Sequence, residues 1–122
     1  MPVTIANVRV LTVRQPYASL IIYGGKDVEN RSQPVRFRGR LYIHAGAALH
    51  EDAPAIRVST DMPLIRRAII GYVQLVDCVR NSRSRWAEPD MWHWLLADPV
   101  PFAQPVPAQG KLGLWYPPEG LS

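Results

Sequence analysis

The stretch QPYASLIIYGGKDVENRS, residues 15–32, decides how this chain begins to fold. Pro16 suits a first helical position, where its missing N–H costs nothing. The apolar residues that follow fall on one helical face, namely Tyr17, Leu20 and Ile21. Gly24 and Gly25 end this helix, and one of them is expected in the left-handed conformation. The stretch therefore predicts a helix of about two turns that leads directly into a charged segment.

The charged segment contains Lys26, Asp27, Glu29 and Arg31, and a turn alone does not need four charges in six positions. If the segment is extended, Glu29 and Arg31 point to the side opposite Lys26. Two interpretations follow. These side chains line a ligand cleft, or they form an ion-pair network that ties the helix end to a sheet. An exposed network would add about 0–1 kcal/mol of stability, whereas a buried one would cost desolvation.

The rest of the chain reads as short strands separated by turns and loops. Strands are expected at residues 8–13, 40–46, 68–80, 91–102 and 112–116, with the fourth ending at Pro99. In the second, Leu41, Ile43 and Ala45 should face one side and Tyr42 and His44 the other. Residues 46–65 contain two prolines and predict a loop with one or two further short helices. The pattern predicts an α+β domain built on a small β-barrel.

Length and composition favour one globular domain over residues 1–122, with 48% hydrophobic residues to supply a core. No apolar run approaches the roughly 20 residues that span a bilayer, and the N-terminus lacks the pattern of a secretory signal. Cys78 is the only cysteine, which excludes a disulfide framework and a cysteine-rich zinc site. We therefore expect a reducing, cytoplasmic location without membrane partners. His44, His50 and Asp52 form no recognisable metal motif, so we expect neither metal nor cofactor.

The net charge is +4, from fourteen basic and ten acidic residues, and twelve of the basic residues are arginines. The planar guanidinium suits phosphates and base edges better than an ammonium group does. This composition permits nucleic-acid binding without requiring it.

Three segments together resemble a known family: residues 11–46, then AIIGYVQLVDC at 68–78, then WHWLLADPVPFAQPVPAQGKLGLW at 92–115. The chain resembles the ASCH (activating-signal-cointegrator homology) family through its G-x-K-x-x-E-x-R run, formed by Gly24, Lys26, Glu29 and Arg31. The resemblance covers nearly the whole chain and implies a PUA-like barrel with a cleft beside the first helix. It also implies binding of RNA or another nucleic acid, and some members of the family are small hydrolases of acetylated cytidine nucleosides or RNA.

A cleft that holds a nucleotide needs cations for the phosphate, an acceptor for base edges and an aromatic face. Lys26 and Arg31 can contact phosphate, and Glu29 can accept a hydrogen bond from an exocyclic amine. Tyr17 is one candidate for stacking, and the others are Tyr42, Trp92 and Trp94. Gln15 at the helix start could help to hold a phosphate, although plain capping and packing explain it equally well.

Two basic segments could extend such a site along a nucleic-acid backbone. Arg36, Arg38 and Arg40 alternate and would form one positive ridge if the segment is extended. Residues 80–86 carry three arginines around Trp86 and are a secondary candidate. The sequence does not fix the choice between RNA, single-stranded DNA and a free nucleotide, nor the oligomeric state.

Catalysis is the alternative to binding alone. The cytidine-deacetylating members of the family carry a threonine where this chain has Glu29, and the preceding lysine is implied to activate it. Glu29 has no hydroxyl group, so that mechanism does not carry over. A ribonuclease could instead use Lys26 and Glu29 as general acid and base, with His44 as a further candidate. A histidine that caps the sheet edge is the structural alternative for His44.

Overall fold

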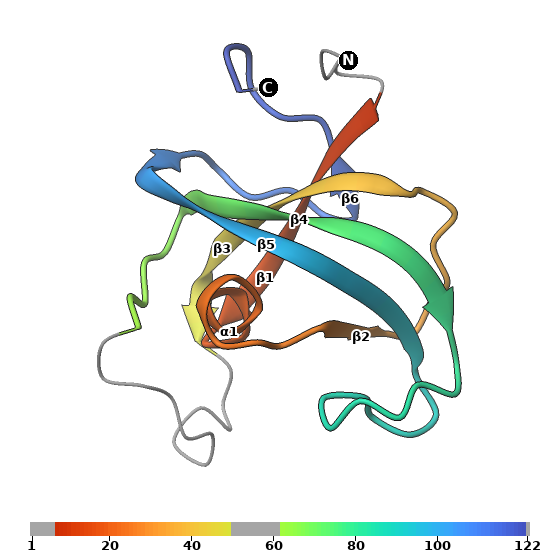
Figure 1. Ribbon diagram of the computed structural model, residues 1–122. Coiled ribbons are helices and arrows are strands. Elements are labelled where there is room, and N and C mark those ends of the chain that lie inside the picture. Colours follow the sequence, from red (N-terminus) through yellow and green to blue (C-terminus); the bar gives the residue numbers. More distant parts are fainter. Residues whose placement is uncertain (1–6, 50–61, 122) are drawn as a thin grey trace.

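The computed structural model describes residues 7–49 and 62–121, in which a curled sheet of six strands wraps around one helix (Figure 1). The strands lie in the order β2-β5-β4-β3-β1-β6; β1 and β3 are parallel and the other neighbours antiparallel. The predicted α+β class with a barrel-like sheet is confirmed. The elements are β1 (Val8–Gln15), α1 (Tyr17–Tyr23), β2 (Val28–Arg31), β3 (Gly39–Leu49), β4 (Ala68–Val79), β5 (Trp92–Pro107) and β6 (Leu114–Trp115).

Helix α1 forms within residues 15–25, as the sequence predicted, and it ends at Gly24 and Gly25. The backbone N–H of Gly24 donates to the carbonyl of Leu20, and Gly25 adopts a φ of 77°. Pro16 directly precedes the first helical residue. A helix of seven residues is too short to be stable alone, so packing must hold it. Ala18, Ile21 and Ile22 supply that packing, because all three are buried in the core.

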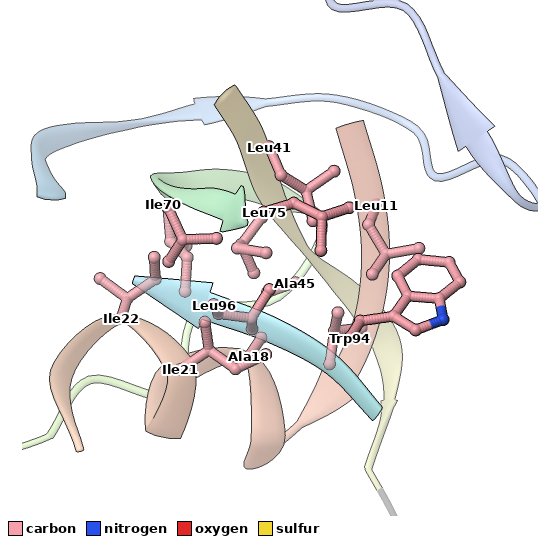
Figure 2. Packing of buried hydrophobic residues seen from close by; sticks show 13 residues of the cluster. Leu11, Ala18, Ile21, Ile22, Leu41, Ala45, Ile70, Leu75, Trp94 and Leu96 are labelled. Carbon is pink, nitrogen blue, oxygen red and sulfur yellow. The ribbon is translucent and has the colours of Figure 1, made fainter. Parts of the chain in front are cut away.

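The main core lies between α1 and the concave side of the sheet (Figure 2). Figure 2 shows Ile21 of the helix near Leu96 of β5, with Leu75 of β4 above them in the view. Every strand from β1 to β5 contributes to the cluster or to the residues packed against it, except β2, whose Val28 is also buried. The helix therefore fills the concave side of the curled sheet, and the chain passes from its C-terminal end into β2.

A second cluster covers the other side of the sheet, and it contains Val8, Val10, Tyr42, Ile69 and Trp115. Leu41 and Ile43 of β3 belong to the main core, whereas Tyr42 between them belongs to the second cluster. The period-two alternation predicted for this strand is thus confirmed.

The segment after the undescribed residues 50–61 is fastened to the start of α1 by Gln15 and Ser19. The Gln15 amide donates to Ser19 Oγ at 2.9 Å and to the carbonyl of Ile65 at 2.6 Å, and its oxygen accepts the Ser19 backbone N–H at 3.0 Å. Ser19 Oγ donates to the carbonyl of Pro63. The short helices expected in residues 46–65 lie partly outside the described residues; 46–49 belong to β3 and 62–65 contain no helix.

Strand β5 does not end at Pro99 as expected, but continues to Pro107. Its first residues, Trp92 to Leu95, pair with β2, and the rest of β5 pairs only with β4 among the described strands. Proline lacks the N–H that a second neighbour would need, so it is tolerated where a strand has one free edge. The prolines therefore mark a free edge rather than the end of the strand.

Gly71 of β4 permits the close crossing of β4 and β5, and this contact is testable. A Cβ at Gly71 would lie 2.4 Å from the carbonyl oxygen of Val100, which is backbone and cannot rotate away. We expect G71A to lower the free energy of unfolding by about 3 kcal/mol through overpacking. G113A is the matched control: it has φ of 65° with open space around it, so it should cost about 1 kcal/mol. Urea denaturation measures both, and equal costs would contradict the proposed crossing constraint.

Candidate functional site

The predicted signature run is organised around the carboxylate of Glu29. Lys26 Nζ lies 3.5 Å from Glu29 Oε1, while Arg31 Nη2 and Nε lie 2.7 Å and 2.8 Å from Oε2. The side chains of Lys26 and Glu29 are 4% and 9% exposed, whereas that of Arg31 is 33% exposed. The ion-pair network considered from the sequence therefore exists. It is mostly buried, and one of its cations reaches the surface.

Lys26 lies on the same side as Glu29 because it precedes β2 rather than belonging to it. After the left-handed turn at Gly25, the backbone N–H of Lys26 donates to the carbonyl of Leu20 at 3.0 Å. This bond turns the chain back toward the helix, and the ammonium group then donates to the carbonyl of Val28. The alternation expected for an extended segment consequently does not apply to Lys26, although Glu29 and Arg31 do share one side.

Burial lowers the pKa of Lys26, since the charged ammonium loses water. The charge of Glu29 and its hydrogen bond oppose this shift, and the charge of Glu88 opposes it more weakly. Arg31 lowers the pKa further because it carries the same charge. The Tyr17 ring faces the ammonium at 5.4 Å, which is within cation–π range. Lys26 is thus a buried amine that releases its proton more readily than an ordinary lysine.

Arg31 connects two strands that are not neighbours in the sheet. Its Nη2 donates to the carbonyl of Thr12 in β1 at 3.2 Å, whereas β2 itself pairs with β5. The guanidinium also lies over the Trp94 ring at 5.8 Å from the centroid. In the β2–β5 register Glu29 lies opposite Trp94 and Arg31 opposite Trp92. The predicted aromatic candidates Trp92 and Trp94 are therefore beside the charged network.

The loop between β4 and β5 borders the same network. Two hydrogen bonds that the sequence did not predict attach this loop to β2. Asn30 of β2 accepts the backbone N–H of Glu88 at 2.9 Å and donates to the carbonyl of Trp86 at 2.9 Å. These bonds place the Glu88 charge near Lys26. Residue 88 is almost sixty positions from the signature run, and Glu88 belongs to no motif, so only the folded chain reveals its proximity.

His44 is not brought together with Lys26 and Glu29. It is buried on the side of the second cluster, where its ring meets Trp115 edge-on at 5.5 Å. Its Nε2 donates to the carbonyl of Ala108 at 2.7 Å, so a neutral ring leaves Nδ1 to accept from Thr12 Oγ1 at 3.2 Å. These contacts are those of a histidine that holds the interior strand β3 and the chain before β6 together.

The remaining predicted ligand residues are distributed around the site rather than within it. Gln15 is fully buried, and its amide is used by Ser19 and Ile65. Arg38 donates to the carbonyls of Val35 and Phe37 and lies 3.5 Å from Asp77. Arg40 lies over the Tyr72 ring at 4.0 Å, with its Nε buried and without a hydrogen-bond partner.

Arg36 and Arg38 precede β3 and belong to no strand, so strand alternation does not align them with Arg40. Arg36 is exposed.

Across residues 7–49 and 62–121, no three histidine, cysteine, aspartate or glutamate side chains are grouped to hold a metal ion. In the same part of the chain, α1 is far too short to cross a bilayer, and no helix there has the length and hydropathy of a membrane span.

Comparison with known proteins identifies the family of this chain and agrees with its fold. The ASCH domain model matches residues 11–105. Activating signal cointegrator 1 of Homo sapiens is 27% identical over 124 residues, which cover 86% of this chain and 21% of that protein. Its Mus musculus counterpart is 25% identical over the same shares. This chain therefore spans about a fifth of the length of these curated relatives.

The crystal structure of ASCH from Zymomonas mobilis has a TM-score of 0.61 at 16% identity, covering 93% of this chain and 89% of that one. A mutant of the Zymomonas mobilis protein has a TM-score of 0.60 at 17% identity, covering 93% and 91%. At such identities the likeness shows the fold alone. The resemblance drawn from the signature run is confirmed by these matches together.

The lowered pKa of Lys26 can be measured directly, because Lys111 is the only other lysine and is exposed. In an NMR titration of the lysine side chains, Lys26 should titrate below its ordinary value of 10.5. E29Q should lower the pKa of Lys26 further by removing its main opposing charge, and E119Q, on an exposed residue, should not.

The same shift has a consequence for stability with a defined sign. Between the folded pKa of Lys26 and its ordinary value of 10.5, the unfolded chain binds more protons. The free energy of unfolding should therefore rise with pH in that window, relative to K26M. Titration of Lys26 at or above 10.5 would contradict both expectations.

Proposed function

This chain belongs to the ASCH domain family, and we propose that it binds RNA, another single-stranded nucleic acid or a nucleotide at the Lys26–Glu29–Arg31 network. The Glu29 carboxylate would accept a hydrogen bond from a base amine, and Arg31 would contact phosphate. Tyr17, beside Lys26, would offer a stacking face. The activities of the longer relatives do not enter this proposal, because the chain spans only about a fifth of their length.

The observation that carries the proposal is an ion-pair network that is mostly buried but has one cation, Arg31, that reaches the surface. A buried ion pair is expensive to desolvate and is often no more stabilising than apolar packing of the same volume. The chain nevertheless buries Lys26 and Glu29 and leaves a third of Arg31 exposed. Lys26 and Asp27 also border a cavity of about 70 Å³ between α1, β4 and β5, otherwise lined mainly by apolar residues. A network held for ligand contact explains this arrangement better than stability does.

Hydrolysis is the second candidate function, and the lowered pKa of Lys26 favours it. A buried amine with a lowered pKa gives up its proton more readily and can act as a general base, for example toward the 2′-hydroxyl of RNA. Glu29 replaces the threonine nucleophile of the deacetylating members, so acetylcytidine is the less favoured substrate. If the chain is an enzyme, Lys26 and Glu29 are better placed for catalysis than His44, which lies with the second cluster.

Binding can be tested with fluorescently labelled single-stranded RNA and DNA of mixed sequence, titrated at two salt concentrations. We expect binding that weakens as salt rises, because phosphate contacts release counterions. K26A should weaken binding about tenfold to hundredfold, since it removes a charge-assisted contact and leaves Glu29 half paired. K111A is the matched control and should change affinity little. Unchanged affinity of folded K26A would show that the site is wrongly placed, and absence of binding at low salt would refute the proposal.

Catalysis is tested separately with RNA and with acetylated cytidine at high protein concentration. Under the hydrolase alternative, RNA is cleaved by the wild-type chain and by H44Q, provided that H44Q folds, but not by K26A. The rate should fall as pH drops below the pKa of Lys26, because the protonated amine cannot accept a proton. Intact RNA and intact acetylcytidine after long incubation would leave binding as the function.

A further inference from the structure

Four cations of this chain lie over aromatic rings along one continuous part of the fold. Lys26 faces Tyr17 at 5.4 Å, and Arg31 lies over Trp94 at 5.8 Å. Two further pairs lie in or beside the β4–β5 loop, namely Arg80 over Trp92 at 5.3 Å and Arg85 over Trp86 at 4.7 Å. The β2–β5 register joins the two halves, because Arg31 lies directly opposite Trp92. The four cation–aromatic pairs therefore form a row from α1 through β2 and β5 into the loop.

The loop, residues 80–91, is fixed to the strand that carries the network. Ser84 Oγ donates to Asp27 at 2.5 Å, and Asn30 makes one hydrogen bond to each of two loop backbone groups. His93 adds a third attachment, since its Nδ1 accepts the N–H of Ser82 at 3.1 Å and its Nε2 donates to the carbonyl of Glu88 at 2.6 Å. Such a loop presents its side chains in one arrangement, so little ordering is needed on binding.

The exposed groups of this loop match a phosphate backbone with unstacked bases. Arg80, Arg83 and Arg85 are exposed, and Trp86 and Trp92 are half-buried. The acidic residues Glu88 and Asp90 come after the last of these arginines, and the charge of Glu88 acts on Lys26. A positive track with aromatic faces at intervals is the general chemistry for binding a single strand. In a duplex the bases are stacked on each other and cannot offer their faces.

We propose that residues 80–92 form a second contact surface for single-stranded nucleic acid, continuous with the Lys26–Glu29–Arg31 network. The ligand is then an oligonucleotide of several residues rather than a free nucleotide. One nucleotide occupies the network, and the neighbouring phosphates contact the loop arginines. This surface extends the site of the proposed function and depends on it, but the two can fail separately.

The experiment compares cytidine monophosphate with single-stranded RNA and DNA of about ten nucleotides, using the whole chain. We expect the oligonucleotides to bind at least about tenfold more tightly than the mononucleotide. R80Q/R83Q/R85Q should reduce the salt slope by about 2, since each lost phosphate contact on a single strand removes about 0.7. R66Q/R67Q/K111Q removes the same charge from exposed basic residues elsewhere and should leave the slope within error. The single variants R83Q and R85Q should each remove about 0.7 even if the triple variant fails to fold.

The outcomes separate the two proposals. If the mononucleotide and the oligonucleotides bind equally well, the network binds nucleotides and the loop surface is refuted. Equal losses in the two triple variants, or loss only in R66Q/R67Q/K111Q, would also overturn it. Polyglutamate of matching charge that binds as tightly as RNA would show a site for acidic polymers instead. Preference for the RNA or the DNA strand identifies the source of the ligand, and binding of neither oligonucleotide nor mononucleotide refutes the proposed function itself.

Discussion

The sharing of one buried carboxylate between two cations constrains the rest of this structure. Glu29 is nearly inaccessible to water, so both its oxygens must be satisfied within the chain. Lys26 reaches one oxygen only because the helix ends at two glycines and turns back, and Arg31 reaches the other from the same side of β2. Arg31 then donates to β1. A single pairing requirement thus fixes the end of α1, the placement of β2 and the link between β2 and β1.

The same constraint bears on the ligand role that we propose for the network. Two cations around one carboxylate leave one positive charge in excess, and the nearby Glu88 partly offsets it. Arg31 is the member that can meet a ligand with least cost, because a third of its side chain already contacts solvent. The ammonium group of Lys26 is kept in the interior by its ion pair with Glu29 and its hydrogen bond to the carbonyl of Val28. In the proposed site, Arg31 is therefore the outer cation and would recognise the ligand, and Lys26 is the inner cation with a lowered pKa.

Sequence patterns predicted what depends on neighbours along the chain and missed what depends on contacts across it. The helix, its glycine end and the alternation in β3 are local, and each was predicted from period and composition. The position of Lys26 was not, because a hydrogen bond to Leu20 overrides strand alternation. The continuation of β5 beyond Pro99 depends on an absent neighbour strand, which only the sheet order reveals. His44 and Glu88 likewise acquire their surroundings from segments more than forty residues away.

The geometry also bears on how a chain with Glu29 in place of threonine could act on RNA. Both Glu29 oxygens are engaged by cations, so this carboxylate would have to break a pair before it could move a proton. The ammonium of Lys26 is also engaged, by Glu29 and by the carbonyl of Val28, but burial lowers its pKa and eases the loss of its proton. A loss of its proton would free Glu29 to turn toward Arg31 or toward a ligand amine. Protonation of Lys26 and the availability of Glu29 are therefore coupled, and binding a base amine at Glu29 should itself shift the titration of the lysine.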